Sequence, residues 1–218
     1  MKRILLFALI SISMTSFACK KEEKEKTPEK VEKKAEKTEK KEAPKKKSFT
    51  LMGDTAAVKW TAYKTSEKKP VGGVFNTVKV DKIHAAPNAM EALDGLAFSI
   101  PVASIFSKNE GRDKKLKESF FGTMTDTTEI KGNLVTKSGK EAFVNLTMNG
   151  ITSKLPVTLK IDGEKVNLTA KLDLKTWKGS AAIAALNVVC AEKHKAKDGK
   201  SVTWDEVAIE VSGTFKIQ

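Results

Sequence analysis

Few residues of this 218-residue sequence are placed where they could do chemistry, and the first of them is a cysteine. Cys19 follows a basic start, Met1 to Arg3, and an apolar stretch, "ILLFALISISMTSFA", at positions 4–18. A helix that spans a membrane needs about 20 apolar residues, and this stretch is shorter. It therefore predicts a secretory signal over residues 1–18, with Cys19 directly after its end.

The ending "SFAC" resembles the lipobox of bacterial lipoproteins, in which the signal is cut before the cysteine and the new terminus is acylated. The resemblance implies that Cys19 carries lipid and anchors the protein in the envelope of a bacterium, since two or more acyl chains give stable anchoring. Lys20 stands where Asp would mark inner-membrane retention, which favours the outer membrane, on its periplasmic face or at the cell surface. The alternative is an ordinary signal that borders a free cysteine.

The remaining candidates for catalysis and metal binding are few. His84 and His194 are the only histidines, and neither lies in a nucleophile motif. Asp113 and Glu118 are five residues apart, off the shared face of a helix, which indicates a solvated surface rather than a paired acid and base. The glycines of "GGVF" lack phosphate-loop spacing. We expect no enzyme and no cofactor; a hydrolase that depends on both histidines is the distant alternative.

Cys190 is the only cysteine besides Cys19, so an acylated Cys19 leaves no intrachain disulfide. Cys190 and His194 are four residues apart and would share one face of a helix. Two ligands are too few for a structural zinc site, which uses four. The sequence therefore predicts a buried structural thiol and no metal site.

The segment 19–47 contains 13 Lys and 8 Glu and no aromatic residue. It has too few apolar side chains to offset the entropy of ordering, so we expect a disordered tether behind the acylated cysteine. A lysine-rich run could instead bind nucleic acid or anionic lipid. The frequent glutamates and the lack of aromatic residues for base stacking argue against nucleic acid, although the chain's net charge is +13.

Residues 48–218 are long enough for one domain with a substantial core, and their hydrophobic pattern predicts strands. Apolar and polar residues alternate from about Thr127 to Leu174, and the pairs Ser138-Gly139, Asn149-Gly150 and Asp162-Gly163 predict tight hairpin turns between four strands. Pro156 removes one ladder bond, so we expect an edge, a bulge or a bend near it. Further strands are predicted at 57–65, 70–82, 95–103 and 202–217.

Eight antiparallel strands predict an all-β fold, an eight-stranded lipocalin-like β-barrel, with a two-layer sandwich as the alternative. Two short helices are expected beside it. In "SKNEGRDKKLKESFF", Ser107 and Glu110 have capping-box spacing, while Leu116 and Phe120 share a face. The Ala-rich stretch "GSAAIAALNVVCAEKH" predicts a helix that lies against the barrel or over its mouth.

Several motifs resemble the YceI-like family, from about Thr55 to Phe215. They are Trp60, "GGVF", "IPVASIFS", "GRDKKLKESFF", "GNLVTKSGK" and "LTMNGITSKLPVTLKI". The resemblance implies an exported lipocalin-like barrel that binds polyisoprenoids or related long-chain lipids. The chain departs from the family at Gly72, Lys115 and Asn149, where many members have His, and at Ser119 and Gly122, near which Asp is common. These departures affect the polar end of an inherited site.

A lipid-binding barrel needs an apolar interior and a mouth, because affinity comes from the apolar area removed from water. The function expected from the resemblance is carriage or sequestration of a polyisoprenoid or fatty-acid-like lipid. A filled barrel that serves as a ligand-free stress or protein-interaction module of the envelope is the alternative, since alternating apolar residues fill any barrel. Two aromatic residues, Phe120 and Phe121, are predicted to plug or gate one end, with Trp177 near the other. The full set of predicted ligand-binding residues is Trp60, Phe75, Phe98, Phe120, Phe121, Leu146, Met148, Val157, Leu159, Leu172 and Trp177.

Overall fold

The computed structural model describes residues 46–137 and 141–218. The predicted signal, the acylated Cys19, nearly all of the tether and the turn at Ser138-Gly139 lie outside the described residues. Within them, no helix combines the length and the apolarity that a membrane span requires.

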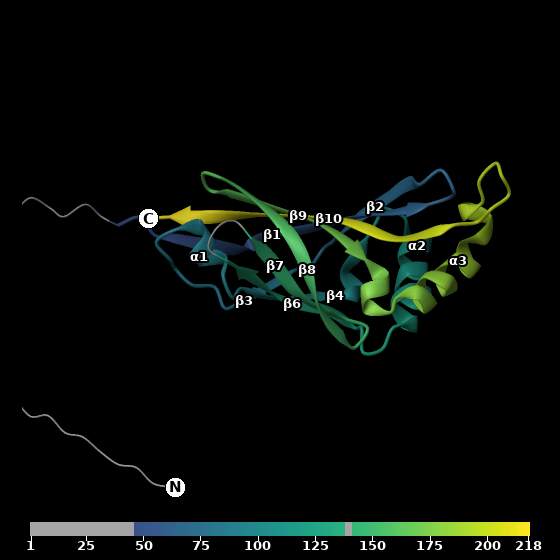
Figure 1. Ribbon diagram of the computed structural model, residues 1–218, viewed down its shortest axis with the longest axis horizontal. Coiled ribbons are helices and arrows are strands. Elements are labelled where there is room, and N and C mark those ends of the chain that lie inside the picture. Colours follow the sequence, from purple (N-terminus) through teal and green to yellow (C-terminus); the bar gives the residue numbers. More distant parts are fainter. Residues whose placement is uncertain (1–45, 138–140) are drawn as a thin grey trace, which may run out of the picture. The chain divides into compact units, whose positions relative to one another are not determined.

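The described residues form one antiparallel sheet that curls into a barrel-like shape, with ten strands rather than the eight predicted (Figure 1). The order of the strands across the sheet is β3-β4-β6-β7-β8-β9-β10-β1-β2-β5. The curled sheet corrects the sandwich alternative and the strand count. The strands are β1 (Phe49–Lys64), β2 (Lys69–Phe75), β3 (Lys79–Asp81), β4 (Ala97–Pro101), β5 (Ile105–Phe106), β6 (Glu129–Thr136), β7 (Ala142–Met148), β8 (Ile151–Asp162), β9 (Lys165–Asp173) and β10 (Thr203–Ile217).

The two extra strands are short and form the two edges of the sheet. The predicted strand at 70–82 is divided: β2 pairs with β1, and β3 pairs with β4 at the opposite edge. Residues 76–78 connect the two, and the Asn76 N–H donates to the carbonyl of Ser104, 2.9 Å away. The covalent chain therefore joins the two edges of the sheet and holds it in its curled form.

Strand β8 changes partner near Pro156. Its first half, Ile151 to Val157, pairs with β7, and its second half, Thr158 to Asp162, pairs with β9. A proline has no N–H to donate, so it fits where ladder bonding passes from one neighbour to the other. The edge, bulge or bend predicted near Pro156 is here a change of pairing partner after Val157.

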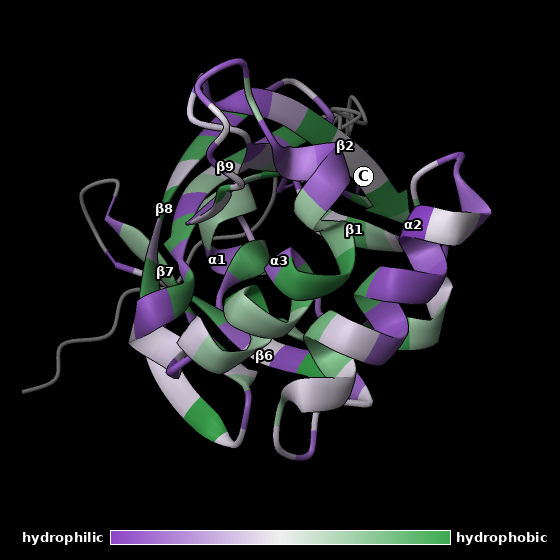
Figure 2. Ribbon diagram, turned by 90° about the vertical axis from the view of Figure 1, so that its right-hand side faces the viewer, coloured by the Kyte–Doolittle hydropathy of each residue, from purple (hydrophilic) through white to green (hydrophobic). Residues whose placement is uncertain are grey.

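Helices cover the two ends of the barrel (Figure 1). At one end lies α1 (Ala89–Leu93), capped by the Asn88 side chain. At the other end lie α2 (Glu110–Lys115), the π-helical turn η2 (Leu116–Phe120) and α3 (Ser180–His194), which confirm the two predicted helices. Figure 2 looks onto this second end, where α2 and α3 cross the ring of strands. The remaining short turns are η1 (Val102–Ser104), η3 (Phe121–Thr123) and η4 (Leu174–Trp177).

The start of α2 differs from the predicted capping box. Asn109 is the N-cap, and its side chain accepts a bond from the N–H of Arg112. Ser107 instead donates its N–H (3.0 Å) and its hydroxyl to the carboxylate of Asp113. Asp113 is buried, 7% exposed, rather than on a solvated surface, because the segment before the helix folds back over it.

Replacement of Asp113 by Ala is expected to lower the free energy of unfolding by about 2 kcal/mol, because the N–H and hydroxyl of Ser107 lose their buried acceptor. Urea denaturation followed by circular dichroism measures this loss. The exposed Glu118, on the next turn, provides the control: Glu118→Ala should change the free energy by less than about 0.5 kcal/mol. Equal effects of the two changes would contradict the assigned role of Asp113.

Gly73 lets β2 lie against the indole of Trp60. A Cβ at this position would lie 2.5 Å from the carbonyl oxygen of Phe106 and 2.6 Å from Cζ2 of Trp60. Gly73→Ala is therefore expected to destabilise the fold by about 1–3 kcal/mol and to alter the near-ultraviolet circular dichroism of tryptophan. Gly111→Ala, in α2, has no such neighbour and should be neutral or stabilising. A Gly73→Ala protein as stable as the parent would contradict the close approach.

Candidate ligand cavity

The interior of the curled sheet is hollow. A cavity of about 190 Å³, here called the inner cavity, lies among the inward-facing side chains of the strands and the end of α1. Its walls are almost wholly apolar, and Ser212 is the one hydroxyl-bearing residue on them. The side chains that line it include Leu51, Phe75, Val80, Leu93, Phe98, Leu134, Leu146, Met148, Val157, Leu159, Leu168, Ala170, Leu172, Ile209 and Val211.

Several of these inward-facing residues are only half-buried. Leu159, Leu168, Ala170, Ile209 and Val211 all line the inner cavity and keep part of their surface accessible. In a filled barrel the same positions would be buried, because interiors pack to crystal-like density. The alternating pattern thus faces an open space rather than opposing side chains.

A second apolar cavity of about 110 Å³, the middle cavity, lies toward α2 and α3. Phe120 and Phe121 form one wall, with their rings edge to face and 4.9 Å between centroids. The middle cavity shares lining residues with the inner one, so the two cavities are neighbours separated by these side chains. The shared residues are Phe75, Ile130, Met148, Leu172 and Ile209.

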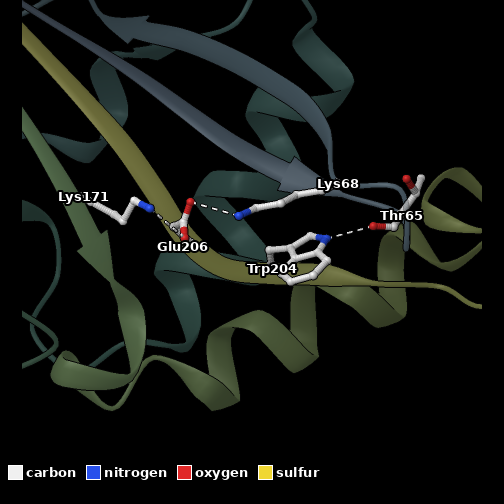
Figure 3. A network of polar contacts seen from close by, with 5 residues as sticks. All are labelled: Thr65, Lys68, Lys171, Trp204 and Glu206. Carbon is white, nitrogen blue, oxygen red and sulfur yellow. Dashed lines mark hydrogen bonds and ion pairs between the residues drawn. The ribbon is translucent and has the colours of Figure 1, made fainter.

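A network of polar contacts fixes one wall of the middle cavity (Figure 3). The indole N–H of Trp204, a lining residue, donates to the carbonyl of Thr65 at 2.8 Å. Lys68 lies over the Trp204 ring, 5.2 Å from its centroid, and pairs with Glu206 at 3.1 Å. Lys171 also pairs with Glu206, at 3.5 Å. Both lysines next to this wall therefore pair with the same carboxylate.

A third cavity, of about 180 Å³, lies between β1, β2, α2 and α3 and is here called the basic cavity. Its basic lining residues are Lys64, Arg112, Lys115, Lys193 and His194, and no Asp or Glu of the described chain lines it. It also shares walls with the middle cavity. The residues common to both are Trp60, Ala62, Leu116, Leu186 and Thr203.

The pKa of His194 is affected by its position in the basic cavity. Partial burial lowers the pKa of His194 from its ordinary value, and the charges of Lys64 and Lys115 lower it further. A lowered pKa keeps the imidazole neutral at pH 7, where its Nδ1 lies 2.7 Å from the hydroxyl of Thr203. Cys190, one turn earlier on α3, is buried as predicted and also lines this cavity.

The structure brings most of the predicted ligand-binding residues to the apolar cavities. The inner cavity contains one set: Phe75, Phe98, Leu146, Met148, Val157, Leu159 and Leu172. Trp60, Phe120 and Phe121 line the middle cavity. Trp177 belongs to the core instead: it is 1% exposed, lines none of these cavities, and donates its indole N–H to the carbonyl of Leu146 at 2.9 Å.

The basic residues were not predicted as site residues. Arg112 and Lys115 stood out only within the resemblance, Lys115 as a departure from it. Nothing in the strand pattern indicates that Lys64, on β1, and Lys193, on α3, line the same cavity, because their convergence depends on how α3 crosses the end of the sheet. The buried indole N–H of Trp60, next to them, has no acceptor among the described residues.

The fold is that of known structures. A polyisoprenoid binding domain from Saccharophagus degradans, implicated in plant cell wall breakdown, superposes with a TM-score of 0.57 at 9% identity, over 78% of this chain and 98% of that one. Burkholderia cenocepacia BcnA matches with a TM-score of 0.46 at 15% identity, over 77% and 99% of the two chains. A Campylobacter jejuni YceI protein matches with a TM-score of 0.44 at 17% identity, over 67% and 84%.

The Saccharophagus chain consists almost wholly of the shared fold. In this chain the described core lies within the compact unit 44–218. A comparison with curated proteins found no match to this chain. The YceI-like domain family matches residues 45–215, which is nearly the whole of that unit. The chain therefore belongs to the YceI-like domain family.

Proposed function

We propose that this protein binds a long apolar molecule, a polyisoprenoid or a fatty-acid-like lipid, inside its barrel and carries or sequesters it without transforming it. The observation that carries the proposal is the inner cavity, about 190 Å³ of space lined by side chains that are almost all apolar. An engineered apolar cavity of about 150 Å³ stays dry and takes up benzene. Membership of the family and the polyisoprenoid binding domain of Saccharophagus support the same ligand class.

The size of the cavities indicates how a long chain would fit. Pockets for small ligands usually measure about 300–1,000 Å³, more than the inner or the middle cavity alone. Met148 and Leu172 stand between the two. Met has three rotatable bonds and adapts its shape readily, so a rotation of Met148 would join the cavities into one bore. Each methylene buried there would contribute about 0.8 kcal/mol to the free energy of binding. The loss of the ligand's conformational freedom on binding opposes this gain.

In the cell, the proposal places the barrel in the bacterial envelope, held near the membrane by acylated Cys19 and the tether that follows it. Such an anchor would keep the barrel where long apolar lipids are found. Binding of an apolar molecule in such a site requires no catalytic side chain.

Organic extraction of purified residues 45–218, followed by mass spectrometry, tests the proposal directly. We expect a stoichiometric long-chain lipid in the extract, and we expect added geranylgeraniol or hexadecanol to change tryptophan fluorescence, since Trp60 and Trp204 line the middle cavity. An empty extract together with unchanged fluorescence would contradict the proposal and favour the ligand-free interaction module.

Ala170→Phe is expected to block the bore, because Ala170 lines the inner cavity and a phenyl ring would occupy the space meant for the ligand. Bound lipid should fall by about tenfold or more, while the fold tolerates the change because the cavity has room for the ring. The matched control is Thr169→Phe, on the outer face of the same strand, which should leave lipid binding unchanged. Undiminished binding by a folded Ala170→Phe protein would place the ligand outside the barrel.

A further inference from the structure

The basic cavity lies at the helix-covered end of the proposed bore, and its lining carries only one sign of charge. Lys64, Arg112, Lys115 and Lys193 line it together with the neutral His194. Within the described residues, none of these four cations has a carboxylate at ion-pair distance. The lysines of Figure 3, at the nearby wall, differ because both lie at ion-pair distance from Glu206.

The basic residues are held in place yet keep free donors. Lys64 donates to the carbonyl of Lys193 at 3.2 Å, and Lys115 donates to the carbonyl of Val189 at 2.6 Å. The bond to the carbonyl of Lys193, in the last turn of α3, also suits the negative end of the helix dipole. The two lysine bonds use one N–H of each ammonium, which has three. Arg112 directs its Nε and Nη2 toward Ser107 and keeps further donors of its guanidinium.

The floor of the basic cavity is apolar and belongs to the bore. Trp60, Leu116 and Leu186 line both the basic and the middle cavity. A ligand that passed this floor would have its tail among apolar side chains and its head among unpaired cations. An uncharged head group would leave those cations with water and backbone carbonyls alone, whereas an oxyanion would pair with them through charge-assisted hydrogen bonds.

We propose that the ligand is an anionic amphiphile whose carboxylate or phosphate head group binds in the basic cavity while its tail extends through the middle cavity into the inner one. This inference rests on the proposed function and adds the chemical class of the head group. Both sources of the oxyanion, a fatty acid and an isoprenyl phosphate, meet the same set of donors on Lys64, Arg112, Lys115 and Lys193.

Two ligand pairs of equal tail test the head group on residues 45–218: geranylgeranyl phosphate against geranylgeraniol, and hexadecanoate against hexadecanol. We expect the anionic member of at least one pair to bind about tenfold or more tightly than its alcohol, as measured by tryptophan fluorescence titration. The pair with the larger ratio identifies the oxyanion. Equal affinity within both pairs would overturn the inference.

The double variant Lys64→Met, Lys115→Met keeps the length of the side chains and removes two charges. It should reduce the preference for the anion to within about threefold, with the affinity for the alcohol unchanged. Lys59→Met is the matched control, because Lys59 lies on the same strand and is paired with Glu210 at 3.3 Å; it should keep the preference. A preference that survives in the folded double variant would overturn the inference.

Salt dependence gives a second measurement that needs no variant. Raising the salt from about 0.05 M to about 0.5 M should weaken binding of the anion by the unaltered protein and leave binding of the alcohol unchanged. An affinity for the anion that does not change with salt concentration would contradict the inference. If neither member of either pair binds, the proposed function itself fails; if both members bind alike, only the head-group assignment fails.

Discussion

The interior of this protein depends on one geometric constraint: a curled sheet of ten strands encloses more space than a single layer of aliphatic side chains fills. Barrels of about eight strands are at the size where side chains just meet or leave room for one small ligand. Here the inward positions of β8, β9 and β10 carry Leu, Ala, Ile and Val, which are too short to meet across the centre. The centre of the curled sheet is therefore open.

The ends are closed by different means. At one end, α1 contributes Ala92 and Leu93, which are almost completely buried. At the other end, α3 lies over the strands beside the π-helical turn η2, which continues α2 and presents Phe120 to the interior. The charges follow the same division, because the basic cavity is found only at the end formed by α2 and α3. An apolar bore with one polar end is the arrangement expected of a site that orients an amphiphile.

The alternation of residues 142–174 was sufficient to predict β7, β8 and β9 and to say which of their side chains face inward, because period two and Gly-containing turns are local signals. The edge strands β3 and β5 were missed because strands of 3 and 2 residues have no readable period. The helix α1 was missed because its 5 residues are too few to show a helical repeat.

Contacts between distant segments were the other limit. Asp113 looked like part of a solvated helix surface, and only the return of Ser107 over it makes it buried. The period-two pattern predicts which strand residues point inward, but the same pattern occurs in filled and in hollow barrels, so it could not show that the centre is open. The convergence of Lys64 with Lys115 and Lys193 depends on three elements that no local pattern connects.

The shortness of the two outermost strands has a consequence for how copies of this protein meet one another. Unpaired backbone at the margin of a sheet invites a neighbouring chain to add a strand, which leads to aggregation. The outermost strands, Lys79–Asp81 and Ile105–Phe106, have only 3 and 2 residues, so they offer almost no template for such addition. At these two margins the protein therefore offers a second copy little backbone with which to pair.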